Sequence, residues 1–236
     1  MNLVILLKDD FKDESHAVIE GRRAKHIIEV HRAEKGKLLK AGLLNSQIGT
    51  GLVTEISADS VELEVKLFGN PPPAPPITLI AALPRPKSFR KVLHAAVSMG
   101  VKNIYFIASW KVEKSYWESP VIGEKEVFEE SILALEQSRD TIMPQIFFRK
   151  RFKPFLEDEV PGIIEDAQCL LAHPGSHPVC PCRISRKAFL AIGPEGGFTD
   201  YERDLFIERG FSPVSIGERI LRTEFAVPAL LSRLIF

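Results

Sequence analysis

Cysteine is scarce in this sequence, which excludes a fold stapled by disulfides. The chain has 236 residues and three cysteines, Cys169, Cys180 and Cys182, and this odd number gives no disulfide framework. His173 and His177 lie nearby and raise the alternative of a zinc site. However, the C-x-C spacing is too tight for a usual structural zinc site. We therefore expect reduced thiols and no metal.

Long hydrophobic runs and a net charge are also missing. The run Leu3–Leu7 is brief and is followed by Lys8, so it resembles neither a membrane span nor a signal peptide. The 31 basic and 31 acidic side chains cancel, which argues against a uniformly basic nucleic-acid binder. We expect a cytoplasmic protein that does not enter a membrane and carries only local basic patches.

Two glycine loops are present, although neither matches a nucleotide motif. Gly193–Gly197 (GPEGG) and Gly217–Arg219 (GER) each follow a short apolar run, Ala188–Ile192 and Pro213–Ile216, which predicts a buried strand. The absence of GxGxxG and GxxxxGK[ST] excludes the dinucleotide fingerprint and the P-loop. Strand, glycine loop and helix in this order are typical of an α/β domain with its loops at the strand ends.

Helix signals surround the first glycine loop. Thr199 and Glu202 have the spacing of a capping box, so a helix begins after Thr199, and Gly210 suits its end. Further elements follow from the apolar periodicity: strands at 77–82, 104–108 and 169–172, and helices at 87–99 and 126–139. This alternation predicts a parallel sheet covered by helices on both faces.

A proline run marks the clearest boundary in the chain. Residues 70–76 hold five prolines, which cannot donate ladder hydrogen bonds and favour a stiff, extended spacer. Before it, strand-like runs occur at 37–43, 50–56 and 60–68, and they predict a small β-barrel. We therefore expect a β-barrel domain over 1–70, a linker over 71–76 and an α/β domain over 77–236.

The sequences of the two glycine loops resemble those of one protein family. GPEGGFT-x-x-E from Gly193 and IGERILRTE from Ile216 are similar to the 16S ribosomal RNA uridine-N(3)-methyltransferases, the RsmE family of the knotted SPOUT superfamily. The resemblance implies transfer of a methyl group from S-adenosylmethionine to N(3) of a uridine in small-subunit ribosomal RNA. It also implies a PUA-like barrel that grips RNA, a SPOUT-type parallel sheet with a C-terminal trefoil knot, and a homodimer.

The methyl donor carries no phosphate, so its site needs apolar walls and close approach of the main chain, which glycine permits. By resemblance, three loops meet at this cofactor: the one after 170–173, the GPEGG loop, and 216–222. The residues expected to bind it are Ala172, His173, Ile192, Gly193, Glu195, Gly196, Ile216, Gly217, Ile220, Leu221, Arg222 and Thr223.

Catalysis is assigned to Arg222 and Glu195. An arginine can stabilise the uracil anion that develops as N(3) loses its proton, through a hydrogen bond to a carbonyl oxygen. The alternatives are that Thr223 caps the last helix, that the arginines pair with acids, and that Glu195 only stabilises its loop. The residues expected to bind RNA are Arg22, Arg23 and Arg32 in the barrel, and Lys87, Arg90 and Lys91 on the polar face of the helix at 87–99.

Parts of the chain depart from the commonest family wording. Residues 94–101 read HAAVSMGV where QKATELGV is usual, and Pro228 is expected to disturb a helix that begins at Thr223. The homodimer is indicated by the apolar residues Leu230, Leu231, Leu234 and Ile235, with packing inside one subunit as the alternative. Two other functions stay open: a SPOUT enzyme acting on another RNA, and a catalytically silent RNA-binding factor.

Overall fold

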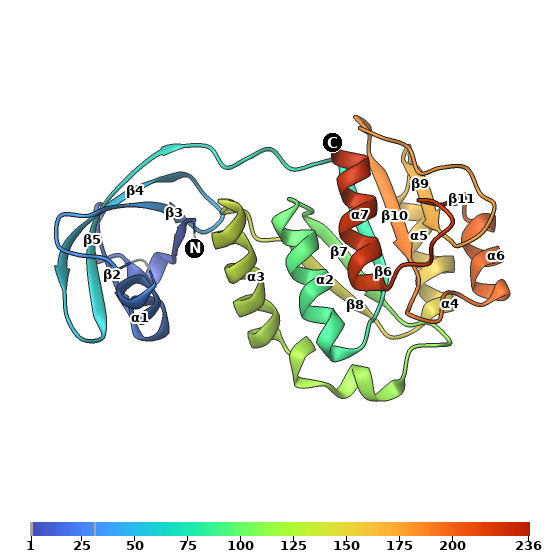
Figure 1. The fold of residues 1–236 in the computed structure, drawn as a ribbon, viewed down its shortest axis with the longest axis horizontal. Helices are drawn as coiled ribbons and strands as arrows, with labels where there is room; N and C mark the ends of the chain where they lie inside the picture. The colour runs from blue at the N-terminus through green and yellow to red at the C-terminus, as the bar shows by residue number, and fades with distance from the viewer. Residues whose placement is uncertain (1, 31) are drawn as a thin grey trace. The chain divides into compact units, whose positions relative to one another are not determined.

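The computed structural model describes residues 2–30 and 32–236. The chain forms two compact units (Figure 1). The first comprises Met1–Pro73 together with Ile132–Met143, and the second comprises Ala74–Ser131 together with Pro144–Phe236. Each unit has its own sheet and its own core, and each is described by itself.

The first unit is built on a mixed five-stranded sheet with the order β1-β3-β4-β5-β2. Only β1 and β3 are parallel, and the other pairs are antiparallel. The three strands expected here are confirmed within two residues, whereas β1, β2 and α1 had not been predicted. The elements are β1 (Val4–Leu6), β2 (His16–Glu20), α1 (Gly21–Glu29), β3 (Leu38–Leu43), β4 (Ile48–Ile56) and β5 (Ser60–Gly69).

The core of the first unit follows the alternation of the sequence. Val61, Leu63 and Val65 are buried, and the residues between them are partly exposed. Ala24 and Ile27 of α1 join the same core. Because side chains in a strand alternate between faces, this pattern fixes which face of the sheet is covered.

The segment Ile132–Met143 completes the first unit. The N–H groups of Asn2 and Leu3 donate to the Glu136 carbonyl at 3.2 and 3.0 Å. Asn45 N–H donates to the Thr141 carbonyl at 2.8 Å, and the Thr141 hydroxyl donates to the Ser46 carbonyl. The last turn of α3 (Glu124–Ser138) and the residues after it are therefore tied to a sheet far away in sequence.

The second unit is an α/β layer structure. Its six strands are all parallel, with the order β11-β9-β10-β6-β7-β8. The strands are β6 (Ile77–Ala82), β7 (Asn103–Ile107), β8 (Gln145–Arg149), β9 (Gln168–Ala172), β10 (Ala188–Ile192) and β11 (Ser212–Val214). The expected parallel sheet is confirmed, and only β8 had not been predicted.

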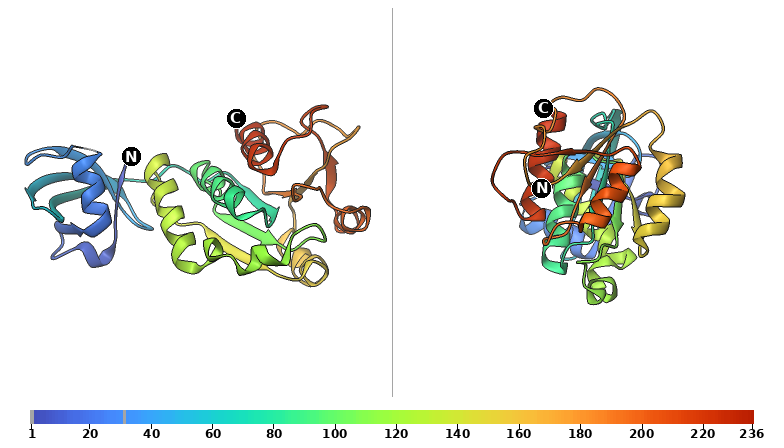
Figure 2. Two further views of the ribbon diagram at one scale, coloured as in Figure 1. Left: turned by 60° about the horizontal axis from the view of Figure 1, so that its bottom comes forward. Right: turned by 90° about the vertical axis from the view of Figure 1, so that its right-hand side faces the viewer.

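Helices cover both faces of this sheet (Figure 2). Helices α2 (Pro86–Ser98) and α7 (Thr223–Ile235) pack against each other on one face. The other face carries α5 (Val160–Ile163) and α6 (Asp200–Glu208), whose Leu205 and Phe206 pack with Ile80 of the central strand β6. Strands β6 and β10 are buried along their whole length, which explains their continuous apolar sequences. Short helical turns complete the second unit: α4 (Phe152–Pro154), a π-helical turn (Phe155–Glu159), and 3-10 turns at Lys114–Glu118 and Pro120–Ile122.

The capping box is confirmed, because Glu202 N–H donates to the Thr199 hydroxyl at 3.3 Å and Thr199 N–H donates to the Glu202 carboxylate at 2.9 Å. Gly210 follows α6 with φ +87°. One expectation about α7 is wrong. Pro228 lies inside the helix, where burial of several apolar side chains outweighs one lost hydrogen bond. The alternative that Thr223 caps α7 is excluded, because the N-cap is Arg222.

Candidate active site

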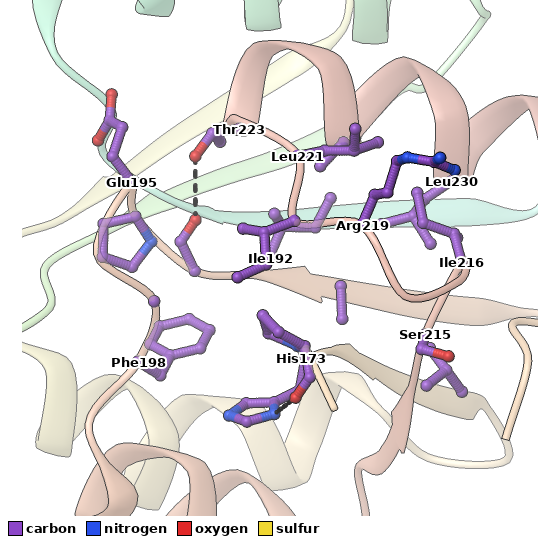
Figure 3. Close-up of a pocket in the computed structure, with 18 of the residues that line it drawn as sticks. His173, Ile192, Glu195, Phe198, Ser215, Ile216, Arg219, Leu221, Thr223 and Leu230 are labelled. Atoms are coloured by element: carbon purple, nitrogen blue, oxygen red, sulfur yellow. Dashed lines mark hydrogen bonds between the residues drawn. The ribbon is translucent and has the colours of Figure 1, made fainter. Parts of the chain in front are cut away.

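A cavity of about 260 Å³ lies at the carboxyl edge of the parallel sheet. The loops after β9, β10 and β11 and the first turns of α7 surround it (Figure 3). All the predicted cofactor residues except Arg222 line it, namely Ala172, His173, Ile192, Gly193, Glu195, Gly196, Ile216, Gly217, Ile220, Leu221 and Thr223. Segments far apart in sequence thus meet where ligands bind to open α/β sheets.

The walls of the cavity are mainly apolar. Ile192, Ile216 and Leu230 contribute aliphatic side chains. Phe198 closes one end and packs on Phe206 of α6, with 5.0 Å between the ring centroids. Figure 3 shows Glu195 at one side of the cavity and Arg219 at the other. An apolar cavity with a few polar groups suits a small organic ligand better than a polyphosphate.

The GPEGG loop, Gly193–Gly197, needs two of its glycines for its own shape. A Cβ at Gly193 would lie 3.0 Å from the Phe198 backbone nitrogen and 3.2 Å from its ring. Gly197 has φ +69°, in the left-handed region that favours glycine. The Thr223 hydroxyl donates to the Gly193 carbonyl at 3.3 Å and so fastens α7 to the loop.

Gly196 is a different case. A Cβ there would lie 2.9 Å from the Cδ atom of Lys111, the flexible part of a side chain. The ammonium of Lys111 donates to the Gly196 carbonyl at 2.7 Å. The close neighbour of Gly196 within the protein is therefore Lys111, a residue that sequence reasoning did not connect with this loop.

Glu195 is also held from outside the cavity. The Arg85 backbone N–H donates to Glu195 Oε1 at 3.3 Å, and the Arg85 Nε atom lies 3.6 Å from the same oxygen. Arg85 follows β6, whereas Lys111 follows β7. The GPEGG loop thus has the cavity on one side and two cationic residues on the other.

Glu202 ties the loop after β7 to the start of α6. This carboxylate is 3% exposed and accepts hydrogen bonds from Trp110 N–H at 2.7 Å and from the Ser109 hydroxyl at 3.2 Å. It also accepts from Thr199 N–H and from the Thr199 hydroxyl. The capping box was visible in the sequence, but nothing in the pattern indicated this second role of Glu202.

The first turn of α7 directs its charged side chains away from the cavity. Arg222 is exposed and does not line it, in contrast to its neighbours Leu221 and Thr223. Glu224 is 7% exposed, and its Oε2 atom has no hydrogen-bond partner among the described residues. Burial acts to raise the pKa of Glu224, but hydrogen bonds from its own N–H and from Ser88, with the charges of Lys91 and Arg85, hold that pKa below its ordinary value.

The predicted RNA-binding residues of α2 lie on its exposed side. Lys87, Arg90 and Lys91 are exposed, as the amphipathic pattern predicted. Arg90 pairs with Glu126 at 3.2 Å and with Glu130 at 3.0 Å. Part of its charge is thus neutralised within the second unit, whereas Lys87 and Lys91 project without an ion pair to any described carboxylate within 4.0 Å.

The three arginines of the first unit that were predicted to bind RNA have different surroundings within that unit. Arg22 and Arg32 are exposed. Arg23 is half-buried, and both ends of its guanidinium donate to the Asp10 carboxylate, at 2.7 and 2.6 Å. Arg23 therefore has a structural partner already, while the other two remain open to solvent.

The histidine and cysteine side chains near the cavity do not assemble a metal site. Across residues 2–30 and 32–236 no three metal-ligating side chains cluster. His173 Nδ1 lies 3.2 Å from His177 Nε2. Cys180 is buried, and burial raises the pKa of its thiol to about 11. No helix in the described part of the chain is long and apolar enough to cross a membrane.

Known proteins resemble the chain along most of its length. A family model described as an RNA methyltransferase domain matches residues 71–235. A protein of Treponema pallidum named ribosomal RNA small subunit methyltransferase E is 29% identical, over 97% of this chain and 88% of its own length. A Borreliella burgdorferi protein named ribosomal RNA small subunit methyltransferase E 1 is 24% identical, over 97% of this chain and 95% of its own.

Two solved structures share the fold. A Legionella pneumophila protein described as a methyltransferase, in complex with bound S-adenosylmethionine, has a TM-score of 0.77 at 21% identity and covers 98% of this chain and 95% of its own. A ribosomal RNA small subunit methyltransferase E of Neisseria gonorrhoeae, bound to S-adenosylmethionine, has a TM-score of 0.74 at 21% identity with the same coverage.

Proposed function

The chain belongs to the RNA methyltransferase family, in its small subunit methyltransferase E group, and from this membership and the cavity we propose that it methylates 16S ribosomal RNA with S-adenosylmethionine. The observation that carries the proposal is the single cavity formed by the loops after β9, β10 and β11 and by α7. These are the loops whose sequences indicated a methyl-donor site. The names of the relatives state small-subunit ribosomal RNA as the substrate and, for the two solved structures, S-adenosylmethionine as the bound molecule. We extend this substrate and this cofactor to the present chain.

The residues of the cavity fit the methyl donor. Its aliphatic walls, Ile192, Ile216 and Leu230, suit an adenine and a methionine side chain. When bound, the donor supplies a methyl group on a sulfonium, so the net reaction exchanges the N(3) proton of a uridine for that methyl group and leaves S-adenosylhomocysteine. Glu195 lies at one side of the cavity, and its side chain pairs with that of Arg85.

We assign the finer chemistry, methylation at N(3) of uridine, to Arg222 and Glu195. A neutral uracil N–H is a poor nucleophile, so the site must stabilise the anion that forms as the proton leaves. Arg222 is exposed beside the cavity, and a guanidinium presents several N–H donors in a planar fork. A guanidinium there can reach a substrate that arrives from solvent and donate to a uracil carbonyl, without contacting the cofactor.

We also propose the finer parts of the fold: a PUA-like barrel over 1–70, the linker over 71–76, and a trefoil knot in a SPOUT domain over 77–236. Support for the knot comes from the end of α7, which returns to the segment between β9 and β10. Arg183 N–H donates to the Arg233 carbonyl at 3.1 Å, and Ile184 N–H donates to the Leu234 carbonyl at 2.8 Å.

A cytoplasmic homodimer is the assembly that we propose. Leu230, Leu231 and Leu234 are buried within their own unit, so they offer no surface to a partner. The exposed apolar side chains lie instead around the start and end of α7: Ile220, Leu221, Phe225 and Phe236. We also propose that Arg22 and Arg32 of the first unit and Lys87 and Lys91 of α2 contact RNA. Arg23 and Arg90 belong to the same two groups of residues, although each already pairs with a carboxylate of its own unit.

The test is methylation of small-subunit particles purified from a strain that lacks this gene, with donor labelled in its methyl group. Digestion of the RNA and mass spectrometry of its nucleosides should find the label in N(3)-methyluridine. Label in another nucleoside would support a SPOUT enzyme of different target. Absence of both donor binding and label would leave only a silent RNA-binding factor.

A further inference from the structure

The GPEGG loop separates the cavity from a second surface, which the sequence motifs did not indicate. Glu195 and Gly196 line the cavity, and Arg85 and Lys111 contact the same two residues from outside. In the sheet, β6 and β7 lie beyond β10, on the side away from β9 and β11. The loops after β6 and β7 therefore form a surface that shares one wall with the cavity.

Trp110 is the most exposed large apolar side chain of the chain's described residues, at 85%. It lies between Ser109, which donates to Glu202 of α6, and Lys111, which donates to the GPEGG loop. An indole in water loses the favourable burial that an aromatic ring normally gains. Its exposure beside a cofactor cavity therefore suggests a partner that covers it.

The backbone under Trp110 is held rigidly. Its own N–H donates to the buried carboxylate of Glu202 at 2.7 Å, and Ser109, 8% exposed, donates to the same group. Lys111 adds the bond to the Gly196 carbonyl. The exposed ring is thus presented from a backbone fixed on both sides, so binding a partner would not require the loop to become ordered first.

The neighbours of Trp110 favour a nucleic acid over a protein as that partner. Lys111, Glu113 and Lys114 are exposed and charged, whereas the centre of a protein interface is depleted of charged side chains. Cations next to an exposed aromatic ring are typical of sites for unpaired nucleic acid, where the ring stacks on a base and the cations contact phosphates.

We propose that Trp110 stacks on an unpaired base of the RNA substrate next to the methylated nucleotide, with Lys111 and Arg85 directed to the adjoining phosphates. This inference rests on the proposed function, since it takes RNA as the substrate. It assigns Trp110 to substrate positioning and not to the chemistry, because Trp110 does not line the cavity. Lys111 also links the two surfaces through its bond to the GPEGG loop.

Fluorescence tests the stacking directly. The chain has two tryptophans, Trp110 and Trp117, so Trp117→Phe leaves Trp110 as the one indole. Titration of this variant with short single-stranded oligouridine should quench its emission, because a stacked base contacts the ring. Titration with an RNA duplex of the same length should quench much less, because its bases are paired. Equal emission with and without the single strand would overturn the proposal.

Kinetics on small-subunit particles supply the second readout. Trp110→Ala should lower kcat/KM for the particles by roughly tenfold or more, which corresponds to the loss of one base–aromatic stack. Trp110→Phe should restore most of it, and donor affinity by calorimetry should be equal in all forms. Tyr201→Ala is the matched control, because Tyr201 is an aromatic residue 59% exposed on α6, away from the cavity lining, and its loss should leave kcat/KM unchanged.

The two proposals fail in different ways. If the parent methylates particles and Trp110→Ala does so equally well, the stacking inference is wrong and the proposed function stands. If the parent methylates no RNA but single strands quench Trp110, the proposed function is wrong and the inference is overturned as a statement about a methylated substrate, with only the binding of an unpaired base left. If neither occurs, both are wrong.

Discussion

Glu136 should make the first unit less stable as the pH rises through neutrality. This carboxyl is 3% exposed, at the end of α3 that packs in the first unit. Burial raises its pKa to about 7, against the N–H of Ile5 and the charges of Arg22 and Arg23, which act to lower it. The folded state therefore retains the proton over a range in which the unfolded chain has already lost it.

The size and sign follow from linkage. Below the ordinary pKa of 4.5 both states are protonated, and Glu136 costs nothing. Between 4.5 and about 7 the unfolded state is ionised and the folded state is not, so the free energy of unfolding falls as the pH rises. A pKa difference of about 2.5, at about 1.36 kcal/mol for each unit, gives a loss of about 3 kcal/mol that is complete above pH 7.

The substitution Glu136→Gln removes this titration and keeps an oxygen that can accept from Ile5 N–H, which donates to Oε1 at 3.4 Å. Urea unfolding of the parent and the variant, followed by hydrogen exchange of amides in the first unit, should give similar free energies near pH 4.5. At about pH 8 the variant should be more stable by up to about 3 kcal/mol. A difference between the two proteins that is the same at both pH values would refute the reasoning, whatever its size.

Further predictions concern the active site. Arg222→Ala should bind S-adenosylmethionine with nearly the affinity of the parent, because Arg222 lies outside the cavity lining, and should lose roughly two orders of magnitude in single-turnover rate, as when one oxyanion donor is removed; an unchanged rate would exclude it from the chemistry. Gly193→Ala should weaken donor binding in calorimetry more than Gly196→Ala, because its Cβ would meet the Phe198 backbone at 3.0 Å, whereas at Gly196 it would meet a flexible lysine. Gly196→Val, with its larger side chain, should still abolish binding, and unaltered affinity there would contradict this.

Strands and helices were predictable where one face or both faces are buried along a whole run. The apolar sequences of β6 and β10 match strands that are buried throughout. By contrast, β1 has three residues and α1 buries only Ala24 and Ile27 among its described positions. Neither segment is therefore long enough, or apolar enough, to show a repeating hydrophobic pattern in the sequence. Strand β8 has no fully buried residue, and its end runs into the basic residues Arg149–Arg151, which do not indicate a strand.

The site was predictable where it follows the chain and not where it depends on packing. The two glycine loops indicated most of the cavity lining, because consecutive loop residues share its wall. Ala226 and Leu230 were missed, since only the folded chain brings this part of α7 to the cavity. Arg222 was expected among the cofactor residues because of its neighbours in sequence, but as the N-cap of α7 it is exposed.

The tie between Ile132–Met143 and the first sheet affects how the protein is made. During synthesis the first 73 residues emerge well before this segment, yet their compact unit includes it. Until translation passes Met143, the Ser46 carbonyl lacks the Thr141 hydroxyl, and the Asn45 amide oxygen lacks the N–H of Met143. The nascent N-terminal part thus stays incompletely bonded until a segment that follows two of the second unit's six strands, β6 and β7, has been made, and a clone that stops at the proline run would encode an unfinished unit.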